Sequence, residues 1–448
     1  MLFHHRITKL AFVASAILGG LRPAAARADD PAPVRALLAD PTMLATWLRD
    51  RDPLIDSSWA RAAAASALAQ QARVLPNPQL SLGWGGIALG RGNLQAGMTG
   101  PTGLGQVSNV TIGASELLEL GKRGPRANAA DVRTREAGES AVGTLGDRIT
   151  AATAALARLV YVSARRDTVL ANLDAARKLR DLEKVRLDNK DLSAAEFARI
   201  ELDTEELELQ LGRAEADLAG AVATCSATVY APCSSAGLDP AALDGAAPLP
   251  STLPEPASAI EGRPIRQVAK LEAQALGWDA TLASHRAIPD LTLGVGYTYD
   301  NYEYSGSIPQ TLTFSIGIPI PLFDRGDHDA AAARSVAHAI EAEDQAAVRE
   351  AHGIVETLLA ERTTLQTTVA KLETSAVPKS MQIIAQTRKA FDLGEARLAD
   401  LLLVERAHRD LLLQVLDTHF DLFNARAQLR QSLGLDDQVA RSVGRRFP

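Results

Sequence analysis

The sequence has few aromatic residues and no long apolar run. Aromatic residues make up only 4% of the 448 positions, although 46% of the residues are hydrophobic. A low aromatic content beside abundant alanine favours long, closely packed helices. No stretch reaches the ~18 consecutive apolar residues that a membrane-spanning helix needs. The composition therefore predicts a mainly helical chain and excludes membrane-spanning helices.

The N-terminus has the features of a secretory signal peptide. Basic or titratable residues at positions 4–9 precede an apolar run over residues 10–21 and a small-residue site at 26–28, which predicts a signal peptide over residues 1–28. No cysteine follows this site, so we expect no lipid anchor. Removal of the peptide takes away four basic residues and moves the formal net charge from -7 to -11. An acidic mature chain argues against nucleic acid as a partner.

The chain contains only two cysteines, Cys225 and Cys233, which lie eight positions apart. Because export leads to an oxidising compartment, the two can close a small loop as a disulfide. The alternative is a pair of free thiols in a connecting segment. The export signal favours the disulfide.

Apolar and small residues alternate in four short segments. In the last of them Leu312, Phe314 and Ile316 point to one face of an extended chain, and Thr, Ser and Gly occupy the positions that follow each of them. A period of two predicts β-strands with one apolar face and one small or polar face. The segments form two predicted strand hairpins, over residues 79–118 and 291–321, each with a polar loop.

Long helical patterns follow each predicted strand hairpin. Apolar residues such as Ile200, Leu207 and Leu211 recur at steps of seven and four, the pattern of a coiled-coil seam. We expect antiparallel helical hairpins over residues 125–224 and 327–433, the first with a descending helix of roughly 95 Å at ~1.5 Å per residue. Pro378 should kink or break the second descending helix.

The two halves of the chain follow one plan, which predicts two internal structural repeats. Arg263-Pro264-Ile265 matches Asp52-Pro53-Leu54 at an offset of 211 positions. The predicted organisation is a signal peptide over 1–28, an N-terminal segment over 29–50, a first repeat over 51–224, a connector over 225–258, a second repeat over 259–433 and a C-terminal tail over 434–448.

The polarity of the strands predicts a membrane barrel. Strands in lipid need every backbone group paired, so the sheet must close without edges. Four strands cannot close around a lumen, and several chains must therefore share one barrel; three chains would give twelve strands. The helical hairpins would continue the barrel as a tube. The alternative is a secreted coiled-coil scaffold whose strands pack one face on a soluble core.

Five segments carry a resemblance to the outer membrane efflux protein (TolC) family, and the likeness covers nearly all of the mature chain. The ELGKR sequence is most similar to the CzcC and CusC subgroup of heavy-metal exporters of the RND type, although a second glycine is usual there and only Gly121 stands before Lys122 here. The segments are PNPQLSLGWG at 76–85, ELLELGKRGPR at 116–126, IPDLTLGVGY at 288–297, IGIPIPLFDRG at 316–326 and AFDLGEARLADLLLVE at 390–405.

The resemblance implies a mainly α protein with a β-barrel part. A homotrimer would place a twelve-stranded barrel in outer membrane lipid, continued by a long α-helical tunnel in the periplasm. A periplasmic adaptor and an inner-membrane RND pump are the implied partners. The protein would be a passive exit duct for heavy-metal cations; drugs, organic toxicants and secreted polypeptide are the alternative cargoes.

The resemblance also implies positions for a periplasmic gate and for adaptor contacts. Asp400 matches the aspartate that constricts the TolC entrance, Glu196 is its counterpart by repeat offset, and Leu403 replaces a second aspartate. Three copies of Asp400 near one axis would attract cations. The alternative is a solvated carboxylate on a helix surface. The expected adaptor-contact tips are Lys190, Asp191, Leu192 and Ser193 in the first hairpin and Gly394, Glu395, Arg397 and Leu398 in the second.

Catalytic and metal-binding patterns are absent from the sequence. Asp324, Asp327, His328 and Asp329 form an acidic cluster, but acidic residues also favour a helix N-terminus through capping and the macrodipole. No paired-histidine spacing accompanies them, so we expect no metal site. No Ser/His/Asp or Cys/His arrangement stands out. We therefore expect neither an enzyme nor a cofactor.

Overall fold

The computed structural model describes residues 31–85, 109–300 and 309–444. The predicted signal peptide and the loops of both strand hairpins lie outside the described residues. The chain divides into two compact units, and long helices contribute to both. Unit 1 contains Met1–Asp52, Ile149–Pro248 and Thr364–Ala427, and unit 2 contains Pro53–Arg148, Leu249–Thr363 and Gln428–Pro448.

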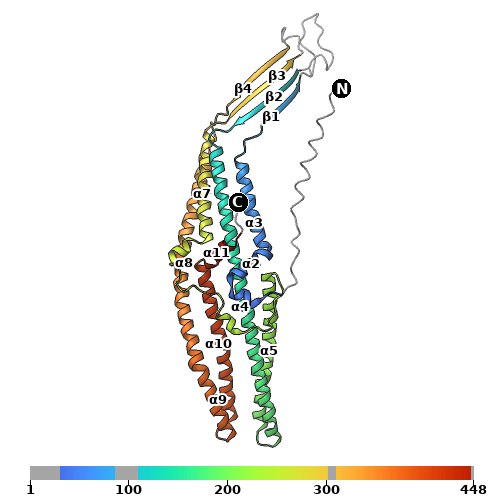
Figure 1. Cartoon of the computed structure of the whole chain (residues 1–448), viewed down its shortest axis with the longest axis vertical. Helices are drawn as coiled ribbons and strands as arrows, with labels where there is room; N and C mark the ends of the chain where they lie inside the picture. The colour runs from blue at the N-terminus through green and yellow to red at the C-terminus, as the bar shows by residue number, and fades with distance from the viewer. Residues whose placement is uncertain (1–30, 86–108, 301–308, 445–448) are drawn as a thin grey trace, which may run out of the picture. The chain divides into compact units, whose positions relative to one another are not determined.

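A four-stranded antiparallel sheet in the order β1-β2-β3-β4 belongs to unit 2 (Figure 1). The register places Leu82 opposite Ile112, Ile112 opposite Tyr297 and Tyr297 opposite Leu312. One row of apolar side chains thus crosses all four strands, as the alternation predicts. The strands are β1 (Gln79–Gly85), β2 (Asn109–Leu118), β3 (Leu291–Asp300) and β4 (Gln310–Gly317).

The last strand is shorter than the sequence predicted. The hairpin was expected to extend to residue 321, but β4 ends at Gly317. Pro319 and Pro321 lack a backbone N–H, and a residue that cannot donate to the ladder ends strand pairing. Ile318 and Ile320 therefore keep the apolar alternation without belonging to the sheet.

The helices of unit 2 surround a core that includes residues near the end of the chain. Ile260, Val355, Leu358 and Leu429 are buried in one cluster. Ile354, an apolar residue of the same helical pattern, is exposed, because its neighbour Val355 is the one buried in this cluster. The elements are α3 (Pro53–Ala72), the first part of α4 (Arg123–Asp188), α6 (Pro256–Glu261), α7 (Pro264–Ser284), η2 (His285–Ala287), most of α8 (Asp327–Lys371) and α11 (Leu435–Val443).

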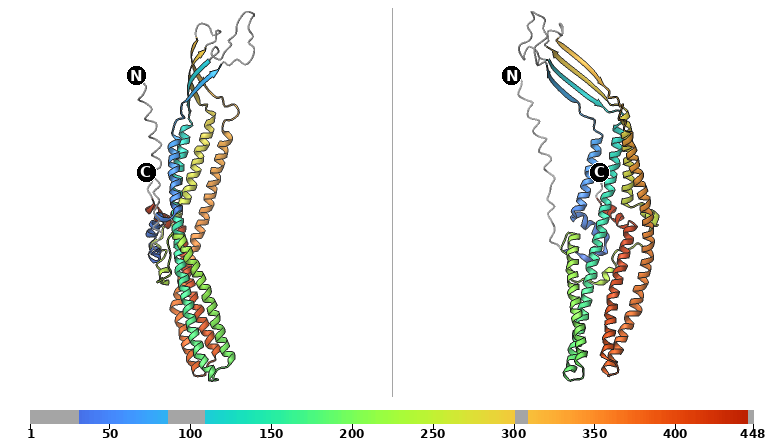
Figure 2. Two further views of the ribbon diagram at one scale, coloured as in Figure 1. Left: turned by 90° about the vertical axis from the view of Figure 1, so that its right-hand side faces the viewer. Right: turned by 180° about the vertical axis from the view of Figure 1, so that it is seen from behind.

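Unit 1 contains two helical hairpins, α4–α5 and α9–α10, whose tips lie side by side (Figure 2). Ile149 and Leu156, seven positions apart on α4, are fully buried. The remaining elements of this unit are α1 (Val34–Ala39), α2 (Pro41–Arg51), α5 (Ala194–Val229), η1 (Pro240–Leu243), η4 (Leu372–Ala376), α9 (Val377–Asp392) and α10 (Leu398–Ser432).

The helical part differs from the prediction at two places and has the predicted interruption at a third. The return helix α5 continues past residue 224 to Val229, where Tyr230 ends it in the left-handed conformation at φ 55°. A π-helical turn, η4, precedes Pro378, which is the interruption expected from a proline without an N–H. The predicted C-terminal tail contains the helix α11, whose Asp436 and Asp437 are buried.

The expectation of a mainly helical chain with a four-stranded sheet is confirmed. The order helix, two strands and helical hairpin occurs in both halves, as α3-β1-β2-α4-α5 and as α7-β3-β4-α8/α9-α10. Within the described ranges, no helix combines the length and apolar character needed to cross a membrane.

Candidate functional site

The first candidate surface is the apolar face of the sheet. The register aligns Leu80 with Ala114, Val295 and Phe314 in a second row beside the one that contains Leu82. Within one chain these side chains are open to the surroundings, and Leu80 and Phe314 are 81% and 77% exposed. An apolar face this continuous requires a cover, because large exposed apolar patches mark contact with another protein or with a membrane.

The opposite face of the sheet consists mainly of glycine, serine and threonine. Ser81, Gly113, Gly296 and Thr313 form one row across the four strands. Gly113 makes room for its neighbour, since a Cβ there would lie 2.7 Å from the Ser81 hydroxyl. This face is small and polar, and it could line a water-filled space.

The outer edges of the sheet leave backbone groups available. Within the described residues β1 pairs only with β2, and β4 pairs only with β3. A long exposed edge with apolar side chains is a template for pairing with another strand. The sheet is therefore open along both β1 and β4.

The ELGKR sequence joins the sheet to the helices of unit 2. The Arg126 guanidinium donates to both carboxylate oxygens of Glu119, at 2.5 and 2.8 Å, and to the Ala72 carbonyl at the end of α3. The Lys122 ammonium donates to Asp290 at 2.7 Å, just before β3. These bonds link the end of α3 and the residue before β3 to the segment that follows β2, so the sequence that carries the resemblance lies where the sheet meets the helices.

The tip of the first helical hairpin is a capped turn. Lys190 adopts the left-handed conformation at φ 64°, and Ser193 caps α5. Glu196 belongs to a capping box: its carboxylate accepts from the Ser193 hydroxyl at 2.6 Å and from the Ser193 N–H at 3.1 Å. These hydrogen bonds lower the pKa of Glu196. The predicted gate residue is thus engaged in the cap of its own helix.

The tip of the second hairpin turns at Gly394, whose φ is 78°. Asp400 lies in the first turn of α10 with its side chain exposed, and it accepts a hydrogen bond from the Arg397 N–H at 3.3 Å. Glu196 and Asp400 therefore occupy equivalent positions, because each carboxylate accepts a hydrogen bond from the backbone N–H three residues before it.

The structure separates the predicted adaptor-contact residues into two groups. Leu192 and Leu398 are buried in a cluster that joins the two tips, so they support the tips from inside and are not available to a partner. The exposed residues are Lys190, Asp191, Ser193, Gly394, Glu395 and Arg397. The cluster consists of Leu192, Phe197, Ile200, Phe391, Leu398 and Leu401.

The contacts between α5 and α10 were not predicted from the sequence. Arg409 donates to both carboxylate oxygens of Asp203, at 2.7 and 2.9 Å, and their side chains are only 12% and 14% exposed. Nearby, burial raises the pKa of Glu405, although Arg388 lies 2.9 Å away and opposes the shift. No local sequence pattern indicates the pair of Arg409 and Asp203, because the pair depends on the lateral register of two helices about 200 positions apart.

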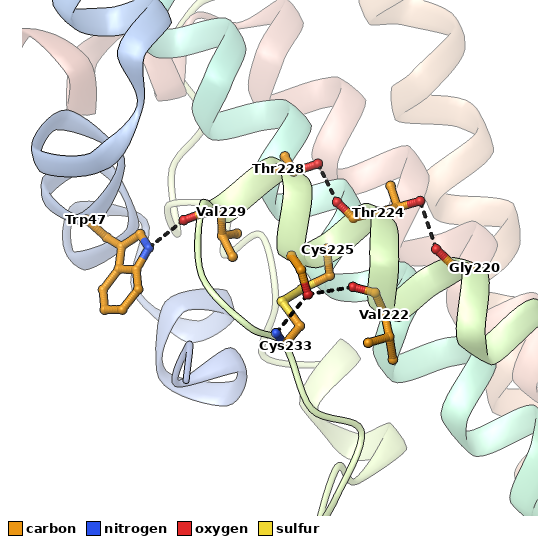
Figure 3. The surroundings of a disulfide bond; sticks show 9 residues. Trp47, Gly220, Val222, Thr224, Cys225, Thr228, Val229 and Cys233 are labelled. Atoms are coloured by element: carbon orange, nitrogen blue, oxygen red, sulfur yellow. Dashed lines mark hydrogen bonds between the residues drawn. A yellow bond between two sulfur atoms is a disulfide. The ribbon is translucent and has the colours of Figure 1, made fainter. Parts of the chain in front are cut away.

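The cysteines are joined by a disulfide (Figure 3). The bond links Cys225 in the last turns of α5 to Cys233 at the start of the connector. The described residues contain no group of three or more His, Cys, Asp or Glu side chains suited to a metal ion. At the acidic cluster, Asp324 accepts from the Gly326 N–H at 2.9 Å just before α8 begins.

Comparisons with known proteins give a family and a fold. Residues 256–435 match the model of the outer membrane efflux protein family, whereas no curated protein matches the chain. The structure is similar to that of CusC, with a TM-score of 0.73 and 15% identity over 89% of this chain and 91% of that one. VceC from Vibrio cholerae gives a TM-score of 0.70 and 19% identity over 88% and 96%. The open state of the MtrE outer membrane channel from Neisseria gonorrhoeae gives 0.67 and 16% over 90% and 88%.

At these identities the solved structures establish the fold, which extends over about nine tenths of the chain. The family model covers the second half, including β3, β4 and the second helical hairpin. The resemblance seen in the sequence is thereby confirmed: residues 256–435 match the outer membrane efflux protein family, and the fold is that of the channel structures.

Proposed function

We propose that this protein is the outer membrane exit duct of a tripartite efflux system. The observation that carries the proposal is the two-faced sheet, in which apolar rows alternate with rows of glycine, serine and threonine over most of its length, with Glu116 and Leu117 as exceptions. A barrel with this polarity faces lipid on one side and water on the other. The duct conducts passively, and the energy for transport comes from the pump.

The open edges support assembly from several copies. Lipid contains no water to satisfy backbone groups, so β1 of one copy must pair with β4 of the next until the sheet closes. Three copies of four strands give a twelve-stranded barrel. The number three is the one that the resemblance to the TolC family implies.

The proposed partners are a periplasmic adaptor, which would contact the exposed residues of the two tips, and an inner-membrane RND pump. The proposed cargo is a heavy-metal cation. The ELGKR sequence and the similarity to CusC favour this cargo over the organic compounds that other ducts of the family could carry. Export assays in cells that hold one pump at a time, first of a metal type and then of a drug type, would test the choice.

The proposed gate is a ring of Asp400 side chains at the periplasmic entrance. Asp400 is exposed, and its carboxylate accepts only one long hydrogen bond among the contacts described, so its charge stays available to the aqueous phase. Negative charges around a narrow aperture concentrate cations there. Glu196 lies at the equivalent position of the other hairpin and would add to the same field.

Conductance across a planar lipid bilayer tests both the duct and the gate. The unmodified protein should form discrete channels that prefer cations, and Asp400→Ala should lower the ratio of cation to anion permeability. Asp410→Ala, an exposed carboxylate ten positions along the same helix, serves as the matched control. Absence of any channel would contradict the duct, whereas equal selectivity of all three proteins would contradict only the gate.

A further inference from the structure

The loop that the disulfide closes contacts an N-terminal arm, which we define as residues 32–52 with the helices α1 and α2. The arm is held by apolar packing, and Leu37, Leu44 and Leu48 are completely buried. It belongs to unit 1 together with α5 and the connector. Within that unit the arm contacts the loop that the disulfide closes.

This loop, residues 226–232, offers two backbone carbonyls to the arm. The Trp47 indole N–H donates to the Val229 carbonyl at 2.9 Å (Figure 3), and the Ala32 N–H donates to the Pro232 carbonyl at 2.8 Å. The two carbonyls lie on either side of Tyr230, which leaves the helix in the left-handed conformation. The relative position of the two carbonyls therefore depends on the path of the chain between the end of α5 and Cys233.

The disulfide fixes that return path. Cys225 and Cys233 bracket the loop, and the Ser226 hydroxyl accepts from the Cys233 N–H at 2.9 Å (Figure 3). A non-glycine residue in the left-handed region costs about 1–2 kcal/mol, which a local constraint on the chain helps to offset. The covalent bond supplies this constraint, and it orients both carbonyls toward the arm.

Burial of the sulfur atoms sets an order of events. In the folded chain Cys225 is fully buried and Cys233 is only 9% exposed. A protein oxidant reacts through a mixed disulfide, which requires direct access to one of the two sulfur atoms. The pair must therefore be oxidised before the segments around it have packed, and the arm that contacts the loop is one of those segments.

We propose that Cys225 and Cys233 are a substrate site for an exported thiol–disulfide oxidoreductase, and that the bond it forms builds the seat on which the N-terminal arm docks. The two thiols lose two protons and two electrons as the S–S bond forms. The electrons pass to the disulfide of the oxidoreductase, which is released as a dithiol. Docking of the arm then covers the bond.

Hydrogen–deuterium exchange on the full chain in detergent tests the dependence of the arm on the bond. In the Cys225→Ser/Cys233→Ser double variant, amides of residues 34–51 should exchange at least about tenfold faster than in the oxidised protein, by the usual effect of a disulfide of this loop size. Trp47→Phe, which keeps the bond and loses one hydrogen bond, should show a smaller change. Unchanged protection in the double variant would overturn the proposal.

The reverse coupling provides a test that keeps the cysteines in place. If the arm covers the bond, Leu48→Ala should loosen the arm and speed reduction of the disulfide by a phosphine at least about tenfold. Leu68→Ala, at an exposed position of α3, is the control and should leave the rate unchanged. Equal reduction rates in Leu48→Ala and the unmodified protein would show that the arm does not guard the bond. Neither readout uses transport, so both outcomes are independent of the proposed duct function.

Discussion

A charge placed on either face of β4 distinguishes a membrane barrel from a soluble sheet. Phe314 and Thr313 are neighbours in the same strand, and they point to the apolar and the polar face, opposite Val295 and Gly296. Both side chains are exposed within one chain. If the sheet were soluble, an arginine at either position would change the free energy of unfolding by less than about 0.5 kcal/mol.

In lipid the two substitutions should differ strongly. An arginine near the middle of the bilayer on the lipid face of a barrel costs about 2–4 kcal/mol, so Phe314→Arg should lower the ratio of folded to unfolded protein by roughly 30- to 700-fold. Thr313→Arg should change it little, because the arginine would point to water. The adjacent Gly296 leaves space for it, since a Cβ there would meet no atom within 4 Å.

The assay is urea unfolding of the protein reconstituted in lipid vesicles, followed by the electrophoretic shift between folded and unfolded forms. The same urea titration is repeated without lipid or detergent. Comparison with the unfolded chain then shows whether either variant aggregates. A loss of stability in Phe314→Arg alone supports the lipid-facing assignment. Equal stability of the two variants, or a larger loss in Thr313→Arg, would refute the reasoning.

Three further predictions concern the helical part. Gly326→Ala should lower the melting temperature far more than Gly394→Ala: both glycines have positive φ, which costs about 1–2 kcal/mol for alanine, but only at Gly326 would a Cβ also collide with a neighbouring carbonyl. Burial raises the pKa of Asp437 to about 6 from 3.8, so stability should fall by about 3 kcal/mol as pH rises from about 4 to 7, and Asp437→Asn should abolish most of this fall in calorimetric scans. Arg409→Ala should cost about 2–4 kcal/mol in denaturant titrations because it strands a shielded carboxylate, whereas removal of the more exposed Arg406 should cost under about 1 kcal/mol.

Local periodicity predicted the elements that depend on neighbours in sequence. The alternation around Phe314 gave the strand and the face of each side chain, and the steps from Ile200 to Leu211 gave the packed side of α5. Glycine and proline marked the interruptions at Gly394 and Pro378. These features follow from backbone sterics and burial, which act over a few residues.

Features that depend on tertiary contacts could not be predicted in the same way. The bond between Arg409 and Asp203 requires two helices from different halves to lie in one register. The seat of Trp47 on the Val229 carbonyl likewise joins segments 182 positions apart. Glu196 was predicted as a gate from its position in the repeat, although Ser193 three residues earlier is the signature of a capping box.

The most direct test of the account is the mass of the protein extracted in detergent from isolated outer membranes, measured by light scattering with correction for bound detergent. The account predicts a membrane-bound assembly of three copies, because the edges at β1 and β4 must be paired for the sheet to close in lipid. A soluble monomer in the periplasmic fraction would contradict it and would mean that the apolar face packs against protein.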